Sequence, residues 1–178
     1  MLPPTLAATL AAASVTACGS SVAARTTTEA KAGPPKPAPS KFLHVDAAHH
    51  AVSLLLIAGD GPSNNGFNFD DYGRGELLIT IPRGWRVTVH CTNHAVLRNS
   101  CAVVSGPNAT RPAFAGATTP NPSQGLESGE SATFSFVASR TGAFRIASVV
   151  PGHEQARMYA VLDVTRGGRP SISARVGP

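Results

Sequence analysis

The sequence predicts an all-β fold, a two-sheet antiparallel β-sandwich with little helix. Three segments alternate apolar and polar residues with the period of two that a half-buried strand requires: 77–81, 87–91 and 133–150. The composition agrees, because 42% of the 178 residues are apolar, only 14% are charged, and 17 glycines and 15 prolines interrupt the chain. This suits one β-rich domain with an appended non-globular segment better than two domains.

Residues 1–18 are expected to be a lipoprotein-type signal peptide. An Ala/Leu-rich apolar run at 6–15 is too short to span a bilayer but suits the hydrophobic part of a signal. The small-residue box VTACG at 15–19 resembles a bacterial lipoprotein processing site, in which Cys18 is acylated. The start, MLPPT, lacks the usual Lys or Arg, so an ordinary cleaved signal with an incidental cysteine is the alternative. We predict export and lipid anchoring to the outer face of the bacterial cell membrane.

Residues 19–40 are expected to be a disordered tether. They consist mainly of Ser, Thr, Ala, Pro and Lys, with almost no large apolar side chain, and they end in GPPKPAPS. Such a segment cannot bury enough surface to offset its conformational entropy. The folded domain is therefore expected at 41–178.

The domain begins with a strand, a turn and a second strand at 42–58. His44, His49 and His50 gather there, but a solvated turn is preferred to a metal site, because no cysteine or acidic partner has metal-site spacing. The loop that follows, 59–75, is rich in turn residues, and we expect its three aromatic side chains to fold onto the edge of the sandwich. These side chains are Phe67, Phe69 and Tyr72.

Further strands are expected along the rest of the domain. The strand at 86–93 should bury Val87, Val89 and Cys91 and leave His90 at the surface. The segment 106–130 contains too many prolines and glycines for regular structure. Paired strands at 132–138 and 143–150, and a strand at 159–165, close the sheet, whereas the polar tail from 166 should fray, with docking of Ile172 and Val176 as the alternative.

Three phrases of the domain, in this order, resemble sulfocyanin and its relatives, which are cupredoxins, or blue copper proteins. They are FNFDDYGRGELLITIPRGW at 67–85, TTPNPSQGLESGESATFSF at 118–136 and VVPGHEQARM at 149–158. The resemblance extends over most of 64–165. It implies a cupredoxin-like Greek-key sandwich with a copper site in the loop before the last family strand.

The resemblance places the four family copper ligands, His, Cys, His and Met, on Asn99, Ser148, His153 and Met158. Two of the four are thus replaced, and a hydroxyl and an amide supply neither the thiolate nor the second imidazole of a type 1 copper centre. We expect Ser148 and Asn99 to hydrogen-bond each other where the metal sits in the family. His153 is expected to be a partly exposed loop residue beside a core Met158, and a residual Cu(I) site made by this pair is the alternative.

A disulfide between Cys91 and Cys101 is also predicted. The period of two places Asn99, Cys101 and Val103 on one face, so both cysteines point into the core from strands that flank one loop. An exported domain folds in an oxidising compartment, where such a pair forms a bond. Two buried free thiols are one alternative, and a Cys101 that reaches the copper position is another.

Three functions remain open at this point. The first is an envelope-anchored, copper-free cupredoxin-fold module that binds a protein partner or supports an assembly. The second is a copper-binding electron-transfer or carrier protein that meets a redox partner and uses His153 and Met158. An enzyme is disfavoured, because no nucleophile, base and orienting group converge. Nucleic-acid binding is disfavoured too, because the net charge of +5 is spread along the chain.

Overall fold

Nine strands and two short 3-10 helices make up the part of the chain that the computed structural model describes, residues 35–176. Cys18, the rest of the expected signal peptide and residues 19–34 of the expected tether lie outside the described residues. No helix in the described range is long and apolar enough to cross a membrane. In chain order the elements are η1 (Pro39–Phe42), β1 (Leu43–Asp46), β2 (Ala51–Ala58), η2 (Ser63–Gly66), β3 (Leu77–Pro82), β4 (Arg86–Asn93), β5 (Ala102–Val104), β6 (Ser131–Val137), β7 (Gly142–Ala147), β8 (Tyr159–Thr165) and β9 (Ser171–Ala174).

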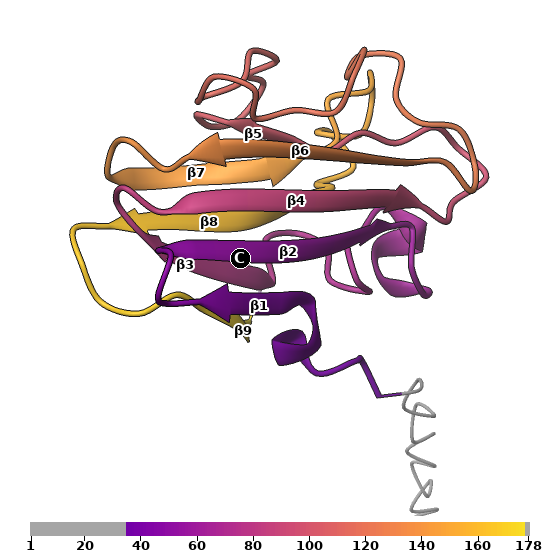
Figure 1. Ribbon diagram of the computed structural model, residues 1–178. Helices are drawn as coiled ribbons and strands as arrows, with labels where there is room; N and C mark the ends of the chain where they lie inside the picture. Colours follow the sequence, from indigo (N-terminus) through magenta and orange to yellow (C-terminus); the bar gives the residue numbers. More distant parts are fainter. Residues whose placement is uncertain (1–34, 177–178) are drawn as a thin grey trace, which may run out of the picture. The chain divides into compact units, whose positions relative to one another are not determined.

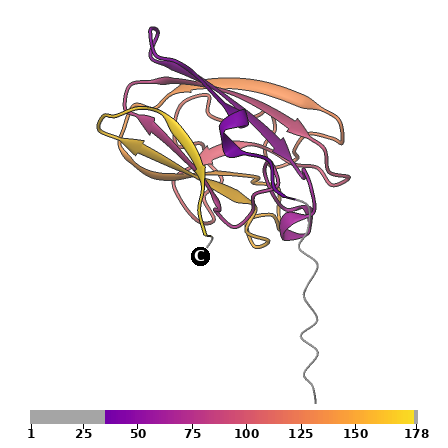
Figure 2. The same ribbon diagram turned by 90° about the horizontal axis from the view of Figure 1, so that it is seen from below.

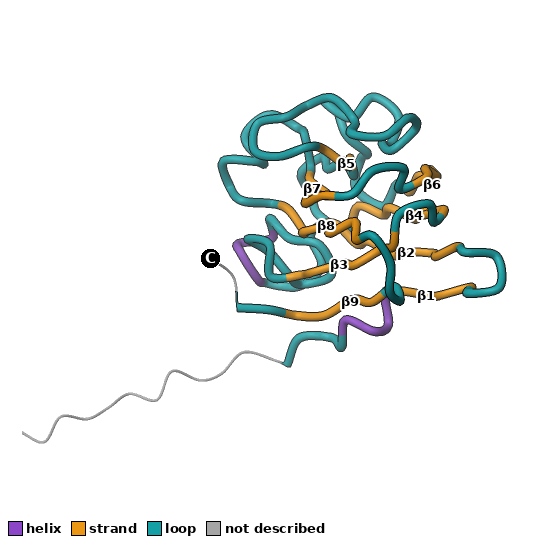
Figure 3. Tube along the Cα trace, turned by 90° about the vertical axis from the view of Figure 1, so that its left-hand side faces the viewer, coloured by secondary structure: helices purple, strands orange, loops and turns teal. Residues whose placement is uncertain are grey.

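The strands form two sheets, with the orders β1-β2-β4-β6 and β5-β7-β8-β3-β9. The four-stranded sheet lies in front of the five-stranded sheet in Figure 1, and the sheets appear as two rows of strands in Figure 3. The predicted two-sheet sandwich is therefore confirmed. The expectation that every pair is antiparallel is wrong, because β2 pairs with β4 and β3 pairs with β8 in parallel. Between β2 and β4 the chain crosses to β3 in the other sheet, so β4 returns in the direction of β2.

The core lies between the inward faces of the two sheets. Alternation along β2 and β4 buries every second side chain, and β4 leaves His90 exposed as predicted. On the outer face, Thr88 bonds Ser135 and His90 bonds Thr133, which gives that face a polar ladder. The largest fully buried apolar side chains come from both sheets and the connecting loop: Leu54, Leu56, Phe69, Leu77, Ile79, Ile81, Val87, Val89, Val103, Ile146, Met158 and Leu162.

A disulfide joins Cys91 of β4 to Cys101, just before β5 of the other sheet, so it ties the two layers together. The two Cα atoms lie 6.2 Å apart, within the usual range for a disulfide, and both side chains are buried. The predicted bond is confirmed, and neither the pair of free thiols nor a Cys101 in the copper position is found. The bond encloses residues 92–100, which make one side of the site described below.

The polar tail does not fray as expected. Residues Ser171–Ala174 form β9, which pairs antiparallel with β3, and Ile172 lies opposite Ile79 and packs against the core. The backbone N–H of Arg175 also donates to the carbonyl oxygen of Glu76, at 2.8 Å. One apolar residue and a row of backbone bonds are enough to hold this edge strand, although its other residues are polar.

The hairpin of β1 and β2 projects from the sandwich at its turn (Figure 2), and two of the three early histidines lie there. His49 bonds Asp46 at 2.7 Å, and the ring of His50 lies 5.3 Å from that of Trp85. All three histidines are exposed, and His44 lies within β1. His49 and His50 therefore take part in separate local contacts.

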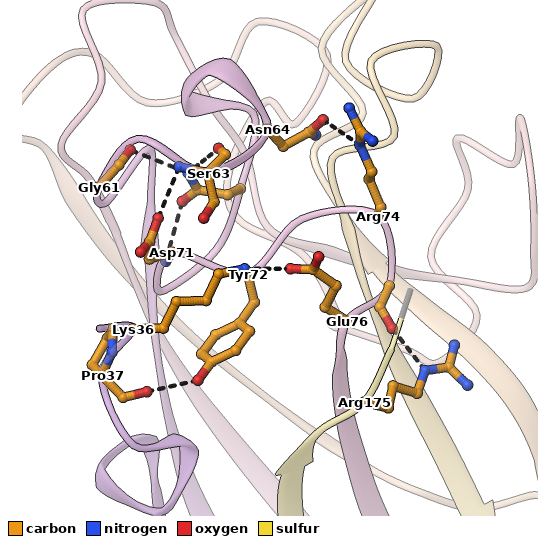
Figure 4. Close-up of polar contacts among 12 residues, drawn as sticks. Lys36, Pro37, Gly61, Ser63, Asn64, Asp71, Tyr72, Arg74, Glu76 and Arg175 are labelled. Atoms are coloured by element: carbon orange, nitrogen blue, oxygen red, sulfur yellow. Dashed lines mark hydrogen bonds and ion pairs between the residues drawn. The ribbon is translucent and has the colours of Figure 1, made fainter. Parts of the chain in front are cut away.

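The folded unit begins earlier than residue 41, because residues 35–40 are ordered against the 59–76 loop (Figure 4). The hydroxyl of Tyr72 donates to the carbonyl oxygen of Pro37 at 2.7 Å, and the ammonium of Lys36 forms an ion pair with Glu76. The ammonium also lies 4.9 Å from the centre of the Tyr72 ring. The disorder expected for this last part of the tether is thus wrong, since composition alone does not reveal these contacts.

Asp70 anchors the same loop from inside the domain. One carboxylate oxygen accepts the N–H of Ile57 at 2.8 Å, and the other is buried without a partner among the described residues. Burial raises the pKa of Asp70 to about 8, with a smaller rise from the charge of Asp60. The folded protein therefore holds this carboxyl protonated at pH values where the unfolded chain releases the proton.

A pH dependence of stability follows from Asp70. The pKa of Asp70 is higher in the folded than in the unfolded state, so its contribution to the free energy of unfolding is complete below about pH 4. This contribution is lost as pH rises to about 8, by at most about 1.4 kcal/mol per pH unit. In Asp70→Asn, whose amide does not ionise, this loss should vanish. Urea unfolding of both proteins between pH 4 and 8 measures it, and a difference between them that does not change with pH would contradict the assignment.

The disulfide should stabilise the domain chiefly by closing a loop of 10 residues in the unfolded chain. The entropic account gives roughly 2 to 3 kcal/mol for a loop of this length. We expect the Cys91→Ala/Cys101→Ala variant to lose about that much unfolding free energy. As a direct check, neither Cys91 nor Cys101 should react with maleimide in denaturant without reductant, and labelling of both would refute the bond.

Candidate functional site

The site is the loop between β7 and β8, which carries three of the four family ligand positions. Ser148 directly follows β7, Met158 directly precedes β8, and His153 lies between them. The N–H of His153 donates to the carbonyl oxygen of Val150 at 3.1 Å. The N–H of Met158 donates to the carbonyl oxygen of His153 at 3.0 Å. These bonds close the loop on itself and direct the three side chains inward.

Ser148 and His153 meet in a direct hydrogen bond, with 2.9 Å between Oγ and Nδ1. The Ser148 hydroxyl oxygen also accepts the N–H of Ser100 at 3.1 Å. With that bond in place, the hydroxyl proton is free to point at Nδ1, and we predict the tautomer with the imidazole proton on Nε2. In return, the N–H of Val149 donates to Ser100 Oγ at 3.0 Å, so two hydrogen bonds join the β7–β8 loop to the segment between β4 and β5.

Asn99 does not bond Ser148, which corrects the expectation from the sequence. Its side-chain amide instead donates to Asn93 Oδ1 at 2.9 Å and to the carbonyl oxygen of Leu97 at 3.1 Å. Asn93 is itself fully buried, donates to the carbonyl oxygens of Leu97 and Leu126 and accepts the N–H of Ala95. Asn99 Oδ1 is buried without a partner among the described residues. The amide therefore belongs to a network that fixes the 94–98 loop.

His153 is 5% exposed, not the partly exposed loop residue expected from the sequence. Its ring meets the edge of Phe67 in a T-shaped contact, with 5.2 Å between the ring centres. Burial lowers the pKa of His153, so the imidazole stays neutral to a lower pH than an exposed histidine. Met158 is fully buried and belongs to the main core.

The hydrogen-bonded pair of Ser148 and His153 does not present a nucleophile to solvent. The hydroxyl group belongs to a residue with no exposed surface. No carboxylate among the described residues bonds His153, and the carboxylate of nearby Glu154 is paired with Arg145. The pair therefore lacks both the access and the third, orienting group of a catalytic triad.

The surface above His153 is apolar. A hollow of about 340 Å³ is bordered by His153, Asn99, Phe67 and the 94–97 loop. Val96 is 94% exposed and Leu97 is 57% exposed at its rim. A second hollow, of about 470 Å³, lies between Phe67, Leu97 and the Val150–His153 turn. Exposed apolar side chains beside concave surface are typical of interaction sites.

Sequence reasoning missed Asn93 and Ser100, which hold the site together. Neither belongs to the family ligand set. The bonds of Ser100 reach the β7–β8 loop, far along the chain, and Asn93 reaches Leu126 in addition to its bonds within the 94–99 segment. The one available signal is the position of Asn93 at the end of a strand, where asparagine often begins a turn. For Ser100, alternation along the strand gives no signal.

The two sheets and the loop that closes over Ser148, His153 and Met158 define a cupredoxin-fold protein. Residues 39–168 match the model of the sulfocyanin (SoxE) domain, which covers most of the chain. The chain belongs to the sulfocyanin family, as its three phrases predicted.

Several solved structures are similar, at low identity. Auracyanin from the photosynthetic bacterium Roseiflexus castenholzii is 20% identical over 64% of this chain and 96% of that one, with a TM-score of 0.48. Rusticyanin from Thiobacillus ferrooxidans is 16% identical over 70% and 86%, with a TM-score of 0.46. A blue copper oxidase from Nitrosomonas europaea is 23% identical over 64% and 38%, with a TM-score of 0.48. A search of curated proteins found no match.

The family implies copper, but the residues at this site do not fit a type 1 centre. A hydroxyl stands where the thiolate is needed and an amide where an imidazole is needed. When one tetrahedral metal ion binds a nitrogen at about 2.0 Å and a sulfur at about 2.3 Å, the nitrogen and the sulfur lie roughly 3.5 Å from each other. Ser148 Oγ and His153 Nδ1 are closer, at a hydrogen-bond distance of 2.9 Å. Within residues 35–176, no group of three or more His, Cys, Asp or Glu side chains is placed to hold a metal.

Replacing Ser148 tests the hydrogen bonds that its hydroxyl makes with His153 and Ser100. Ser148→Ala removes the bond to His153 and leaves the buried N–H of Ser100 without its acceptor, so we expect a loss of about 1 to 3 kcal/mol in unfolding free energy. Ser131→Ala is the matched control, because it removes a serine whose hydroxyl bonds Thr92 on the exposed face of the sheet. Urea unfolding measures both variants. Equal losses of unfolding free energy would show that the buried hydrogen bonds of Ser148 stabilise the protein no more than the exposed bond of Ser131.

Proposed function

We propose that this protein is a copper-free member of the sulfocyanin family that acts as a binding module for a protein partner at the bacterial envelope. The observation that carries the proposal is the direct bond between Ser148 Oγ and His153 Nδ1, at 2.9 Å. In the family these positions supply two metal ligands. Here they bind each other, so the loop gains its closure from a hydrogen bond.

The chemistry of the side chains supports the same proposal. A serine hydroxyl does not ionise near neutral pH, and an amide oxygen is a weak ligand for copper. The amide nitrogen of Asn99 is already committed to Asn93 and Leu97. Without a thiolate the site lacks the group that couples copper electronically to a redox partner.

The apolar surface above His153 is the proposed docking face. Val96 and Leu97 expose large apolar side chains there, and the hollow beside them offers room for a side chain of the partner. The disulfide and the Asn93 network hold the 94–98 loop in place. A loop that is rigid before binding loses little conformational entropy when the partner docks.

The cellular setting is part of the proposal. Acylation of Cys18 would hold the exported protein on the outer face of the cell membrane, and residues 19–34 would serve as the spacer. The role is a binding or assembly role and not an enzymatic one, which agrees with the full burial of Ser148. Neither nucleic acid nor a cofactor is required.

A second candidate is a copper carrier or electron-transfer protein. It is favoured by the retention of His153 and Met158 at their family positions, in one loop and on the same buried side. For copper to bind, the Ser148 to His153 bond would have to break, because Nδ1 is engaged in it. Copper analysis of the purified protein after copper addition, with its visible spectrum, separates the two candidates.

Restoring the ligands gives a sharper test. The native protein should show no intense blue absorption with copper, whereas Asn99→His with Ser148→Cys should create it, because His153 and Met158 complete the set. The new thiol stays free, since Cys91 and Cys101 are already bonded to each other. Visible absorption spectroscopy during copper titration is the measurement.

The single variant Ser148→Cys is the control, and it should give at most a weaker thiolate band because one imidazole is still missing. A blue native protein would overturn the copper-free proposal. A double variant that folds, keeps its free thiol and stays colourless with copper would mean that His153 and Met158 no longer hold ligand geometry.

A further inference from the structure

We infer that a third hollow beside the docking face, bordered by Arg74 and Arg157, binds a carboxylate of the partner. This inference rests on the proposed docking function and names the chemistry of the partner. The segment recognised would carry an apolar side chain next to an aspartate or glutamate.

The hollow has a volume of about 290 Å³, and its lining combines two arginines and three amide residues with Phe67 and Ala156. Arg74 and Arg157 lie on its border with the carboxamides of Asn64, Asn65 and Gln155, and no acidic residue lines it. Phe67 lines this hollow and also both apolar hollows above His153. Asn65 also borders the first apolar hollow, so the cationic hollow and the apolar docking face form a continuous surface.

Both arginines have a backbone conformation that favours glycine. The φ angles are +55° at Arg74 and +61° at Arg157, in the left-handed region that bulky L-residues seldom adopt. The two are joined, because the N–H of Arg74 donates to the carbonyl oxygen of Arg157 at 2.9 Å. Asn64 and Asn65, at +51° and +55°, line the same hollow. Backbone strain of this kind gathers at functional sites, where the side chain is needed in spite of it.

Arg74 is oriented before any ligand arrives. Its Nε–H donates to Asn64 Oδ1 at 2.9 Å (Figure 4). The side-chain amide of Asn64 is fixed in turn by the carbonyl oxygens of Phe67, at 2.6 Å, and Ala156, at 2.8 Å. Within the described range, no acidic side chain forms an ion pair with Arg74, so its two terminal nitrogens remain available for the paired hydrogen bonds that a carboxylate accepts.

A carboxylate of a protein fits better than a free anion because of what lies beside it. The docking face next to the hollow is apolar and exposes Val96 and Leu97, which a free anion would leave uncovered. A peptide that pairs an apolar side chain with an acidic one covers both parts of the surface. Charge complementarity of this kind sets specificity and speeds association.

Two dipeptides test the inference on the full chain, with Cys18→Ala to prevent lipidation. Acetyl-Leu-Glu-amide and acetyl-Leu-Gln-amide differ only in the charge, and ¹⁵N NMR titration gives both dissociation constants and locates the shifts. We expect shifts around Phe67 and Arg74, with the glutamate peptide bound about three- to fivefold tighter, as for an exposed ion pair. Arg74→Gln should abolish that preference.

Arg169→Gln is the matched control, because this exposed arginine lies in the β8–β9 connection at the other end of the sandwich (Figure 1). It removes the same charge and should keep the preference. Arg74→Gly should also lose the preference, yet melt at the native temperature or above it, because glycine relieves the strained φ. A preference that survives Arg74→Gln, or a strong loss of thermal stability in Arg74→Gly, overturns the inference.

The remaining outcomes separate this inference from the proposed function. If both dipeptides bind equally at Phe67, the carboxylate site is refuted and the apolar docking face stands. If neither shifts any signal there, the inference fails and the docking face loses its support, while the copper titration still decides the copper-free state. If inorganic phosphate shifts the Arg74 signals as strongly as the glutamate peptide does, the hollow is a general anion site and the partner carboxylate is refuted. If vesicles with 30% phosphatidylglycerol do so, the ligand is a lipid headgroup.

Discussion

The hydrogen bond between Ser148 and His153 is the contact on which the site depends. It closes the β7–β8 loop over the core, and its serine oxygen also accepts the N–H of Ser100, which links the loop to the segment between β4 and β5. In a blue copper protein the metal makes this connection. Here two neutral side chains make it, with the buried imidazole kept uncharged by a lowered pKa. A bond of this kind is weak in water but costly to lose inside a protein, because its partners have no substitute.

Covalent and hydrogen bonds of the protein itself hold the rest of the site. The Cys91–Cys101 disulfide ties the two sheets together at the base of the 94–98 loop, and the buried Asn93 holds that loop through four side-chain hydrogen bonds. These contacts keep the apolar rim in place above His153. A surface that is ordered before binding suits the docking role proposed here.

Sequence reasoning predicted the local features of this protein and missed the distant ones. The period of two placed Cys91 and Cys101 on the inner face, and this was enough to predict their bond. Strand direction has no such signature, so the parallel pairs were missed, and a tail with Ile172 as its one well-placed apolar residue did not reveal β9. Among the bonds of Asn93, the one to Leu126 joins residues that only folding brings close. The left-handed Arg74 was hidden because glycine, not arginine, marks that conformation in a sequence.

The central claim is that His153 gives its Nδ1 to a serine and not to a metal. The nitrogen shifts of this imidazole report it directly, since they distinguish a protonated, a hydrogen-bonded and a metal-bound nitrogen. We predict a proton on Nε2 and a hydrogen-bonded Nδ1 in ¹⁵N NMR of the purified protein, both unchanged by one equivalent of Cu(I), which is diamagnetic. Loss of the Nδ1 signal from its hydrogen-bonded position, with a new metal-bound shift at one equivalent, would contradict the account.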